Sequence, residues 1–219
     1  MVVKLNLAKG HTVVTYPALL FLAISLFITL LNLSMWLLLF MAIILLVFIV
    51  QFFRDPERIC QTKDPLAILA SADGVVFDID TSNSDITVIR TRMRFWDVHV
   101  IRMPVTGTLV DKRRFGGYYL PIIPWLNHRA KSRNARQELS FQHPTGFSFK
   151  VVQVSGILAY RCISYHEVAE NLILQGDRIG MIRFGSETDV HFPTNRIHGV
   201  VPVGTKIKAG SSVLCYLRE

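Results

Sequence analysis

The feature that most constrains this chain is a stretch near its N-terminus, residues 12–53, that contains no Asp, Glu, Lys or Arg. If residues 18–53 formed one straight helix, it would be about 54 Å long at a rise of about 1.5 Å per residue. A bilayer core is only about 30 Å thick and takes about 20 residues. The one polar break is Asn32-Leu33-Ser34. We therefore expect two membrane helices, at about residues 17–31 and 35–53, joined by a tight turn. Because the first helix is short, a hairpin that crosses the bilayer only in part is the alternative.

Basic residues flank the apolar stretch, with Lys4 and Lys9 before it and Arg54 and Arg58 after it. By the positive-inside rule, both ends then lie in the cytoplasm. A cleaved signal peptide is the alternative, but its apolar region would span about 7–15 residues and end at a small-residue cleavage site. This run is far longer and lacks such a site. We interpret residues 1–53 as a permanent membrane anchor and residues 54–219 as a domain on the cytoplasmic face.

The remainder, residues 54–219, has the pattern of a folded β domain. The chain as a whole is 51% hydrophobic and 18% charged, which excludes intrinsic disorder. Short strand-like runs alternate with Gly and Pro, and turns led by Gly176 and Gly204 are spaced as in biotinyl and lipoyl carrier domains. We expect a mostly β fold (α+β at most), a lipoyl/biotinyl-carrier-like flattened β-barrel behind a transmembrane hairpin. The candidate strands are 74–79, 86–90, 97–101, 107–111, 139–141, 147–154, 157–164, 181–184, 190–192 and 212–217.

Charge and cysteine usage narrow the function classes. Residues 54–219 carry 22 basic and 16 acidic residues, but no basic stripe interleaved with aromatics that would indicate nucleic-acid binding. A basic surplus beside a membrane anchor suits an anionic lipid surface. The sequence contains no nucleotide-binding or metal-binding motif. The three widely spaced cysteines, Cys60, Cys162 and Cys215, form no zinc pattern, and a cytoplasmic position predicts reduced thiols.

The most informative window is residues 176–193, in which the pair Gly185-Ser186 lies between two expected strands. A serine held in a strained turn after glycine can attack the preceding carbonyl, because glycine leaves that carbonyl sterically open. From spacing alone, an ordinary β-turn is the better explanation of the pair.

Five segments in order make this chain resemble the phosphatidylserine decarboxylase proenzymes, in particular their short, membrane-anchored bacterial form. The run RFGSETDV at 183–190 resembles the self-cleavage site of that family. The other segments are FFRDPER at 52–58, ADGVV at 72–76, DVHVIRMPVTG at 97–107 and RNAR at 133–136. The resemblance spans most of the chain.

The resemblance implies a self-made cofactor. Ser186 Oγ would attack the Gly185 carbonyl, and the chain would separate into a large part, 1–185, and a small part, 186–219. Residue 186 would lose ammonia and become a pyruvoyl group. That ketone would form a Schiff base with the serine amine of phosphatidylserine and accept the electron pair left by CO₂, giving phosphatidylethanolamine. The implied location is the inner membrane, and a homodimer is one state that we consider.

The resemblance also implies roles for individual residues. Asp73 matches the catalytic Asp of the family, and His99 matches the first His of its H-x-x-H-x-P strand. The second His, usually assigned to cleavage, is Arg102 here, so the general base for cleavage stays open. We expect Arg102, Arg133 and Arg136 to bind the lipid phosphate, since Arg forks match phosphate oxygens. His191 and His198 are two further candidates for the general base. The only reason to consider them is that they follow Ser186 closely in the sequence.

Two alternatives stay open at this point. An archaetidylserine decarboxylase would use the same headgroup chemistry on a different lipid backbone. A non-enzymatic membrane adaptor with a lipoyl-like barrel belongs to another class, but such adaptors usually carry long helical hairpins beside the barrel. The apolar, Gly/Pro-rich segment 115–125 is a candidate for contact with lipid headgroups through Tyr118, Tyr119 and Trp125.

Overall fold

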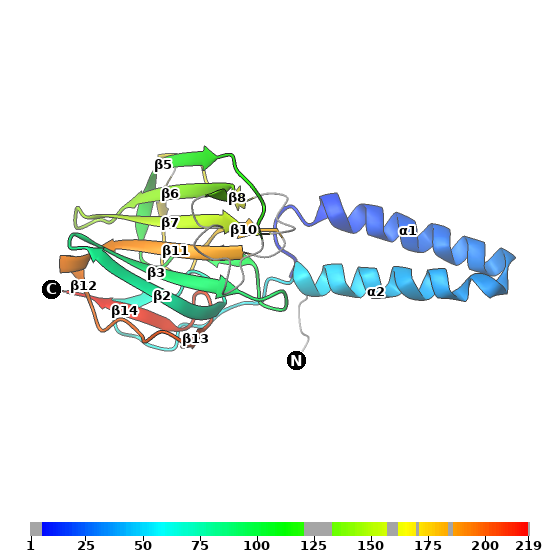
Figure 1. The fold of residues 1–219 in the computed structure, drawn as a ribbon, viewed down its shortest axis with the longest axis horizontal. Helices are drawn as coiled ribbons and strands as arrows, with labels where there is room; N and C mark the ends of the chain where they lie inside the picture. The colour runs from blue at the N-terminus through cyan, green and yellow to red at the C-terminus, as the bar shows by residue number, and fades with distance from the viewer. Residues whose placement is uncertain (1–5, 121–132, 157–161, 170, 184–185, 219) are drawn as a thin grey trace. The chain divides into compact units, whose positions relative to one another are not determined.

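The computed structural model describes residues 6–120, 133–156, 162–169, 171–183 and 186–218, with Ser186 described by its backbone only. The chain divides into two compact units, Met1–Pro56 and Glu57–Glu219. The first is helical and the second is built of strands, as Figure 1 shows.

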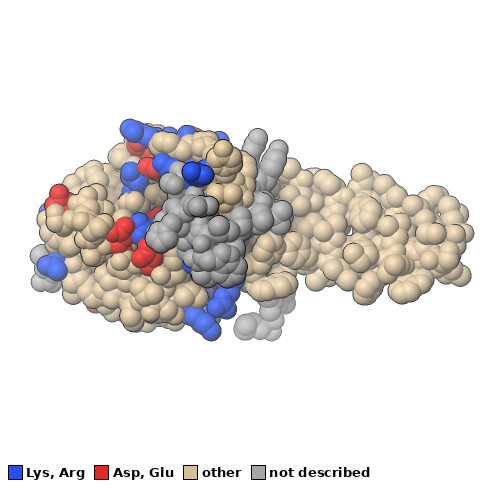
Figure 2. All heavy atoms as spheres, in the orientation of Figure 1, with Lys and Arg blue, Asp and Glu red and all other residues tan. Residues whose placement is uncertain are grey.

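The helical unit is a hairpin of two apolar helices, α1 (Thr12–Leu31) and α2 (Trp36–Phe52), joined by the short 3-10 helix η1 (Leu33–Met35). Asn32 Oδ1 accepts hydrogen bonds from the Ser34 N–H and hydroxyl, which fixes the turn. The predicted break is thus confirmed. The apolar spans Thr12–Leu31 and Leu33–Phe52 are each long enough to cross a bilayer, and Figure 2 shows no charged side chain on their visible face.

Helix α1 begins at Thr12, five residues before the predicted start, and therefore contains Pro17. Pro17 is the sixth residue of α1 and lies beyond the first turn, so its missing N–H removes one intrahelical hydrogen bond. Polar side chains inside α1 bond to their own backbone. The hydroxyl of Ser25 donates to the Phe21 carbonyl at 2.7 Å, and that of Thr29 to the Ser25 carbonyl at 2.8 Å. An apolar surrounding requires such internal satisfaction.

The second unit is mostly β, as predicted. Each of the ten candidate strands overlaps an observed strand, and residues 157–161 and 184 of the candidates lie outside the described part. Four strands of two or three residues, β1, β9, β12 and β13, had not been predicted. The strands are β1 (Ala67–Leu69), β2 (Gly74–Asn83), β3 (Ile86–Met93), β4 (Val100–Arg102), β5 (Gly107–Phe115), β6 (Arg136–Gln142), β7 (Ser148–Ser155), β8 (Cys162–Ser164), β9 (Leu172–Ile173), β10 (Arg178–Ile182), β11 (Ser186–Pro193), β12 (Ile197–His198), β13 (Lys206–Ile207) and β14 (Val213–Leu217).

An antiparallel sheet of eight strands dominates this unit, in the order β13-β2-β3-β11-β7-β6-β5-β9. It curls into a half-barrel (Figure 1). Two three-stranded sheets, β1-β14-β12 and β4-β10-β8, complete the unit.

The buried face of the large sheet changes character along its strands. At one end, Phe141, Phe149 and Phe192 stack with ring centroids 5.2 and 5.4 Å apart. Toward the other end, the buried positions on the same strands are polar. Gln137, Gln153 and Thr188 lie in register with one another and are almost fully buried. Burying an amide or a hydroxyl costs free energy unless the group is hydrogen-bonded. We therefore look for a functional site at the polar end of the sheet.

Candidate functional site

Ser186 is the first residue of β11, a strand in the middle of the large sheet. Its backbone is in register with Met93, the last residue of β3, and with Ser155, the last residue of β7. Strands β2, β5 and β6 begin or end at the same side, at Gly74, Phe115 and Arg136. We call this the Ser186 end of the sheet. The other half of the predicted cleavage pair, Gly185, lies outside the described residues.

Asp73 lies at the Ser186 end because it directly precedes β2. Gly74 has a φ of +153°, and a Cβ there would lie 2.2 Å from the Arg92 carbonyl oxygen of β3, so only glycine allows this close approach. The order β2-β3-β11 places the start of β2 two strands from Ser186. That separation is about 10 Å, since neighbouring strands lie about 4.8 Å apart.

The Asp73 carboxylate is buried, with the residue only 7% exposed, and both oxygens have partners. Arg58 Nη2 lies 2.6 Å from Oδ2, and the Ala209 N–H donates to Oδ1 at 2.8 Å. Burial raises the pKa of Asp73, and the Arg58 charge and the Ala209 hydrogen bond oppose that rise without cancelling it.

His99 lies fully buried just before β4. Its Nδ1 lies 2.9 Å from the Asp97 carbonyl oxygen, which can only accept, so Nδ1 carries the proton. When the ring carries no second proton, Nε2 is its basic atom. The His99 carbonyl accepts the Ile182 N–H at 3.2 Å, which joins the His99 backbone to β10. Ile182 lies four residues before Ser186 in the chain.

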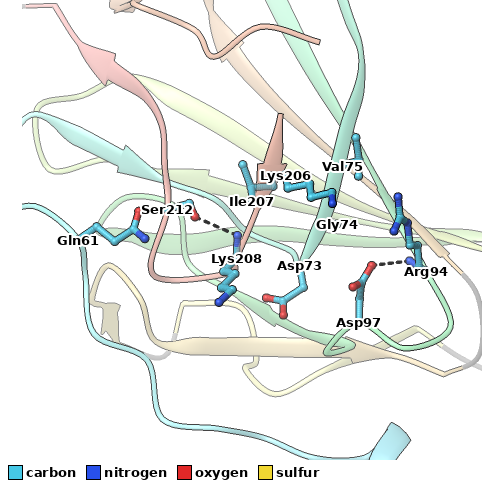
Figure 3. Close-up of a pocket in the computed structure, with 10 residues that line it drawn as sticks. All are labelled: Gln61, Asp73, Gly74, Val75, Arg94, Asp97, Lys206, Ile207, Lys208 and Ser212. Carbon is cyan, nitrogen blue, oxygen red and sulfur yellow. Dashed lines mark hydrogen bonds between the residues drawn. The ribbon is translucent and has the colours of Figure 1, made fainter. Parts of the chain in front are cut away.

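A pocket of about 300 Å³ opens beside Asp73 at the starts of β2 and β13 (Figure 3). Asp97 forms part of its wall and accepts the Arg94 N–H at 2.7 Å through Oδ2. Both acidic and basic side chains line this pocket, which suits a ligand that carries both charges. Its lining residues are Gln61, Asp73, Gly74, Val75, Arg94, Asp97, Lys206, Ile207, Lys208 and Ser212.

A second pocket, of about 200 Å³, lies on the other side of Ser186, over the ends of β5, β6 and β7. The Arg136 guanidinium lies 4.4 Å above the Phe115 ring, and Arg136 Nε is 3.1 Å from a Glu138 oxygen. Burial raises the pKa of the Cys162 thiol to about 11, so this pocket holds a neutral thiol and not a nucleophile. The lining residues are Arg114, Phe115, Gly116, Tyr119, Ala135, Arg136, Gln137, Ser155 and Cys162.

The three predicted phosphate-binding arginines lie in different surroundings. Arg136 lines the second pocket. Arg133, three residues before Arg136 in the chain, is exposed. Arg102 is 5% exposed, and its Nη1 donates to the Gly176 carbonyl at 3.0 Å. A Cβ at Gly210 would lie 2.7 Å from Arg102 Cδ, so this side chain is packed tightly. Phosphate binding by these residues stays a prediction.

Neither of the late histidines lies beside Ser186. His191 is five residues further along β11, about 16 Å away at about 3.3 Å per residue. Burial lowers its pKa to about 4. His198 belongs to β12 in a different sheet, with its ring 5.9 Å from that of Tyr216. Proximity in sequence therefore does not make either one a partner for Ser186.

Sequence reasoning missed two residues that organise the site. In the sequence, Arg58 lies beside the apolar stretch and in the FFRDPER segment, which predicted no role for it at the site. Asn134, within the RNAR segment, is 1% exposed and bonds to the Leu120 backbone and, at 2.7 Å, to the Ser155 carbonyl. It thus ties the Tyr118–Tyr119 region to the strand beside Ser186. No spacing pattern in the sequence indicated either contact.

Comparison with known proteins gives consistent matches. The profile of the family described as phosphatidylserine decarboxylase matches residues 45–215. A phosphatidylserine decarboxylase proenzyme of Burkholderia vietnamiensis is 35% identical over 181 residues, which cover 80% of this chain and 82% of the relative. Proteins of the same name from Burkholderia ambifaria and Burkholderia multivorans are 35% and 34% identical over the same shares.

Proposed function

Because this chain belongs to the phosphatidylserine decarboxylase family, we propose that it converts phosphatidylserine to phosphatidylethanolamine and CO₂. The observation that supports the proposal is that Ser186 and the buried Asp73 lie at one end of the large sheet, and that Asp97, two residues before the buried His99, lines the same pocket as Asp73. Each of the three residues stands in a segment that resembles a family motif.

The proposed maturation cuts the chain between Gly185 and Ser186. In that step Ser186 Oγ loses its proton and bonds to the Gly185 carbonyl carbon, and the peptide nitrogen takes up a proton as its bond to that carbon breaks. Elimination then releases residues 1–185 as a carboxylate and leaves dehydroalanine at position 186. Its imine tautomer takes up water and loses ammonia to leave the pyruvoyl group, which when present supplies an electron sink for decarboxylation.

The fold suits a chain that is cut at this place. Residues 186–219 would stay bound through β11, which pairs with β3 and β7, through β13, which pairs with β2, and through β14, which pairs with β1. A group at residue 186 would be held by the Met93 and Ser155 backbones. We propose that the two parts remain one folded unit.

In this proposal His99 is the residue that accepts the Ser186 proton. Its Nδ1–H is committed to the Asp97 carbonyl, which orients the ring and leaves Nε2 as the proton acceptor. A buried imidazole with one fixed nitrogen is suited to taking up and returning a proton without rotating.

We further propose that lipid approaches through the two pockets at the Ser186 end. Arg136 lines one of them, and exposed tyrosines, Tyr118 and Tyr119, lie just beyond its Phe115. Tyrosine favours the membrane interface, and arginine pairs with phosphate. The apolar helices would anchor the chain in the inner membrane, with the catalytic unit on the cytoplasmic side, where Arg54 and Arg58 follow the second helix.

The test uses the full chain expressed in membranes. Denaturing electrophoresis should show parts corresponding to residues 1–185 and 186–219, and the protein should release labelled CO₂ from phosphatidylserine labelled in its carboxyl group. Ser186→Ala should stay uncut and inactive, whereas Ser148→Ala, on the exposed far end of β7, should behave as wild type. A folded wild-type chain that stays whole and inactive would overturn the proposal. Ether-linked archaetidylserine as substrate tests the alternative lipid backbone.

A further inference from the structure

The Asp73 carboxylate joins three segments that are far apart in the sequence. It pairs with Arg58 at 2.6 Å and accepts the Ala209 N–H at 2.8 Å. Asp97, two residues before His99, lines the same pocket as Asp73, and the Val98 backbone N–H, directly before His99, lowers the pKa of the Asp73 carboxyl. The loop that leads to His99 therefore lies beside the carboxylate.

This arrangement depends on a negative charge that burial disfavours. The Arg58 and Asp73 side chains are only 14% and 11% exposed. A buried carboxylate without a cationic partner takes up a proton, because removing an isolated charge from water is costly. A protonated Asp73 would lose part of its capacity to accept hydrogen bonds, and its hold on the Val98 and Ala209 segments would weaken.

The cationic partner of the Asp73 carboxylate is not Arg102. Arg102 occupies the position of the second histidine in the family's H-x-x-H-x-P strand, but its guanidinium donates to the Gly176 carbonyl. Arginine also keeps its proton at physiological pH. The contact seen at the Asp73 carboxylate is Arg58 instead, 15 residues earlier in the chain.

We propose that Arg58 is a positioning residue for self-cleavage, which acts through the Asp73 carboxylate to hold the His99 loop beside Ser186. The inference rests on the proposed function. It assigns to Arg58 a role in the reaction beyond flanking the membrane segment.

Other charged groups also face Asp73. Asp97 raises the pKa of the Asp73 carboxyl, and Arg94, Lys206 and Lys208 line the same pocket. Burial is the largest influence on the pKa of Asp73, and the Arg58 charge, which lowers it, is the next largest. Loss of Arg58 should therefore move the pKa of Asp73 further upward.

The first experiment is a double-mutant cycle on the full chain, synthesised in the presence of lipid vesicles and followed by gel from precursor to cut product. Arg58→Met and Asp73→Asn should each slow cleavage about tenfold or more, since small displacements of reacting groups have effects of that order. If Arg58 acts through Asp73, the double variant should be no slower than Asp73→Asn alone. Arg58→Lys, which keeps the charge, should restore most of the rate.

Arg90→Met is the matched control. Arg90 is also a little-exposed arginine, 12% by side chain, and pairs with Asp78 at 2.7 Å, Asp80 at 2.9 Å and Asp189 at 3.6 Å. None of its ion pairs within the described residues involves Asp73. It should cleave at nearly the wild-type rate. Thermal melting of each variant identifies loss of folding, and Arg58→Gln replaces Arg58→Met if the latter melts below the assay temperature.

The pH dependence of the cleavage rate separates this role from a merely structural one. It is measured by a pH jump on the purified, slowly cleaving Arg58→Met precursor. Its rate should rise with pH as Asp73 re-ionises, over and above any rise from His99. The Arg58→Met/Asp73→Asn precursor should lack that additional rise.

Three results would overturn the inference: wild-type cleavage rates in Arg58→Met, multiplicative effects in the double variant, or equal slowing by Arg90→Met. An uncut wild-type chain would instead overturn the proposed function, so the two failures are distinguishable.

Discussion

The two ends of the large sheet are made of the same strands but of different chemistry. At the far end, strands β2 and β3 are joined by the tight turn after Asn83, whose Oδ1 accepts the Asp85 N–H at 2.9 Å, and three phenylalanines stack beneath. At the Ser186 end, the same face buries Gln153 and Thr188, and the ionised pair Arg58–Asp73 lies beside it.

The difference separates stability from function. Stacked aromatic and aliphatic side chains at the far end bury large apolar areas and stabilise the sheet. Polar groups at the Ser186 end are costly to bury and are retained where they position reacting atoms. Substitutions at matched positions of the two ends should therefore affect different quantities, stability at the far end and reaction rate at the Ser186 end.

The largest expected effect is that of His99→Ala. Loss of a positioned proton acceptor should slow cleavage by about 10²-fold or more. The matched variant at the far end is His143→Ala, whose ring stacks on Phe147 at 4.5 Å in the turn between β6 and β7. It should cleave and decarboxylate within about twofold of wild type. Equal losses in the two variants, measured by precursor conversion at equal folded fraction, would remove the contrast between the ends.

The next effect concerns substrate binding. Arg136→Gln should raise KM for phosphatidylserine about tenfold with little change in kcat, because a lost charge-assisted contact to phosphate is worth about 1.5–3 kcal/mol. The control is Arg113→Gln, since Arg113 is 68% exposed and pairs only at the surface with Asp111. A kcat defect with unchanged KM would show that Arg136 does not bind the headgroup.

A smaller, several-fold effect is expected from the exposed tyrosines. The pair Tyr118→Ser/Tyr119→Ser should lower activity on bilayer substrate more than on short-chain phosphatidylserine, because tyrosine partitions to the membrane interface. Activity on vesicles and on short-chain lipid, measured side by side, gives the ratio. An equal loss on both substrates would exclude a role in bilayer contact.

The smallest effect is a gain in stability. Gln153 is fully buried, and within the described residues neither of its amide atoms has a hydrogen-bond partner. Gln153→Met, of similar volume, should raise the free energy of unfolding by about 1 kcal/mol and slow the reaction. Gln142→Met at the far end should not raise it, because Gln142 already bonds to Gly146 and Ser148. Thermal melting in detergent measures both, and destabilisation by Gln153→Met would contradict the account.

Much of the fold follows from local patterns. An uncharged stretch interrupted only at Asn32-Leu33-Ser34 predicts a hairpin, because each arm alone must match a bilayer. Alternation and Gly turns predict the long strands of the sheet. Strands of two residues, such as β9 and β13, carry too few positions to show a period of two, so they escaped prediction.

The site was predictable only in part. Family resemblance pointed to Ser186, His99 and Asp73. The fold places Ser186 and Asp73 at one end of the large sheet, and Asp97, two residues before His99, lines the pocket beside Asp73. The Arg58–Asp73 pair could not be predicted, because it depends on how the chain returns past β2 and not on spacing. Phosphate binding by Arg102 stays a prediction, and the hydrogen bond from its guanidinium to the Gly176 carbonyl is a contact that no spacing in the sequence indicated.

The most direct test of the central claim, that the Ser186 end becomes the reactive site, is the intact mass of the small part of the wild-type chain. The account predicts residues 186–219 with a mass lower by one ammonia than a chain beginning with serine, and reaction of its N-terminus with a carbonyl reagent. A small part that begins with an unmodified serine, a cut at another place, or a chain that folds and stays whole would contradict it.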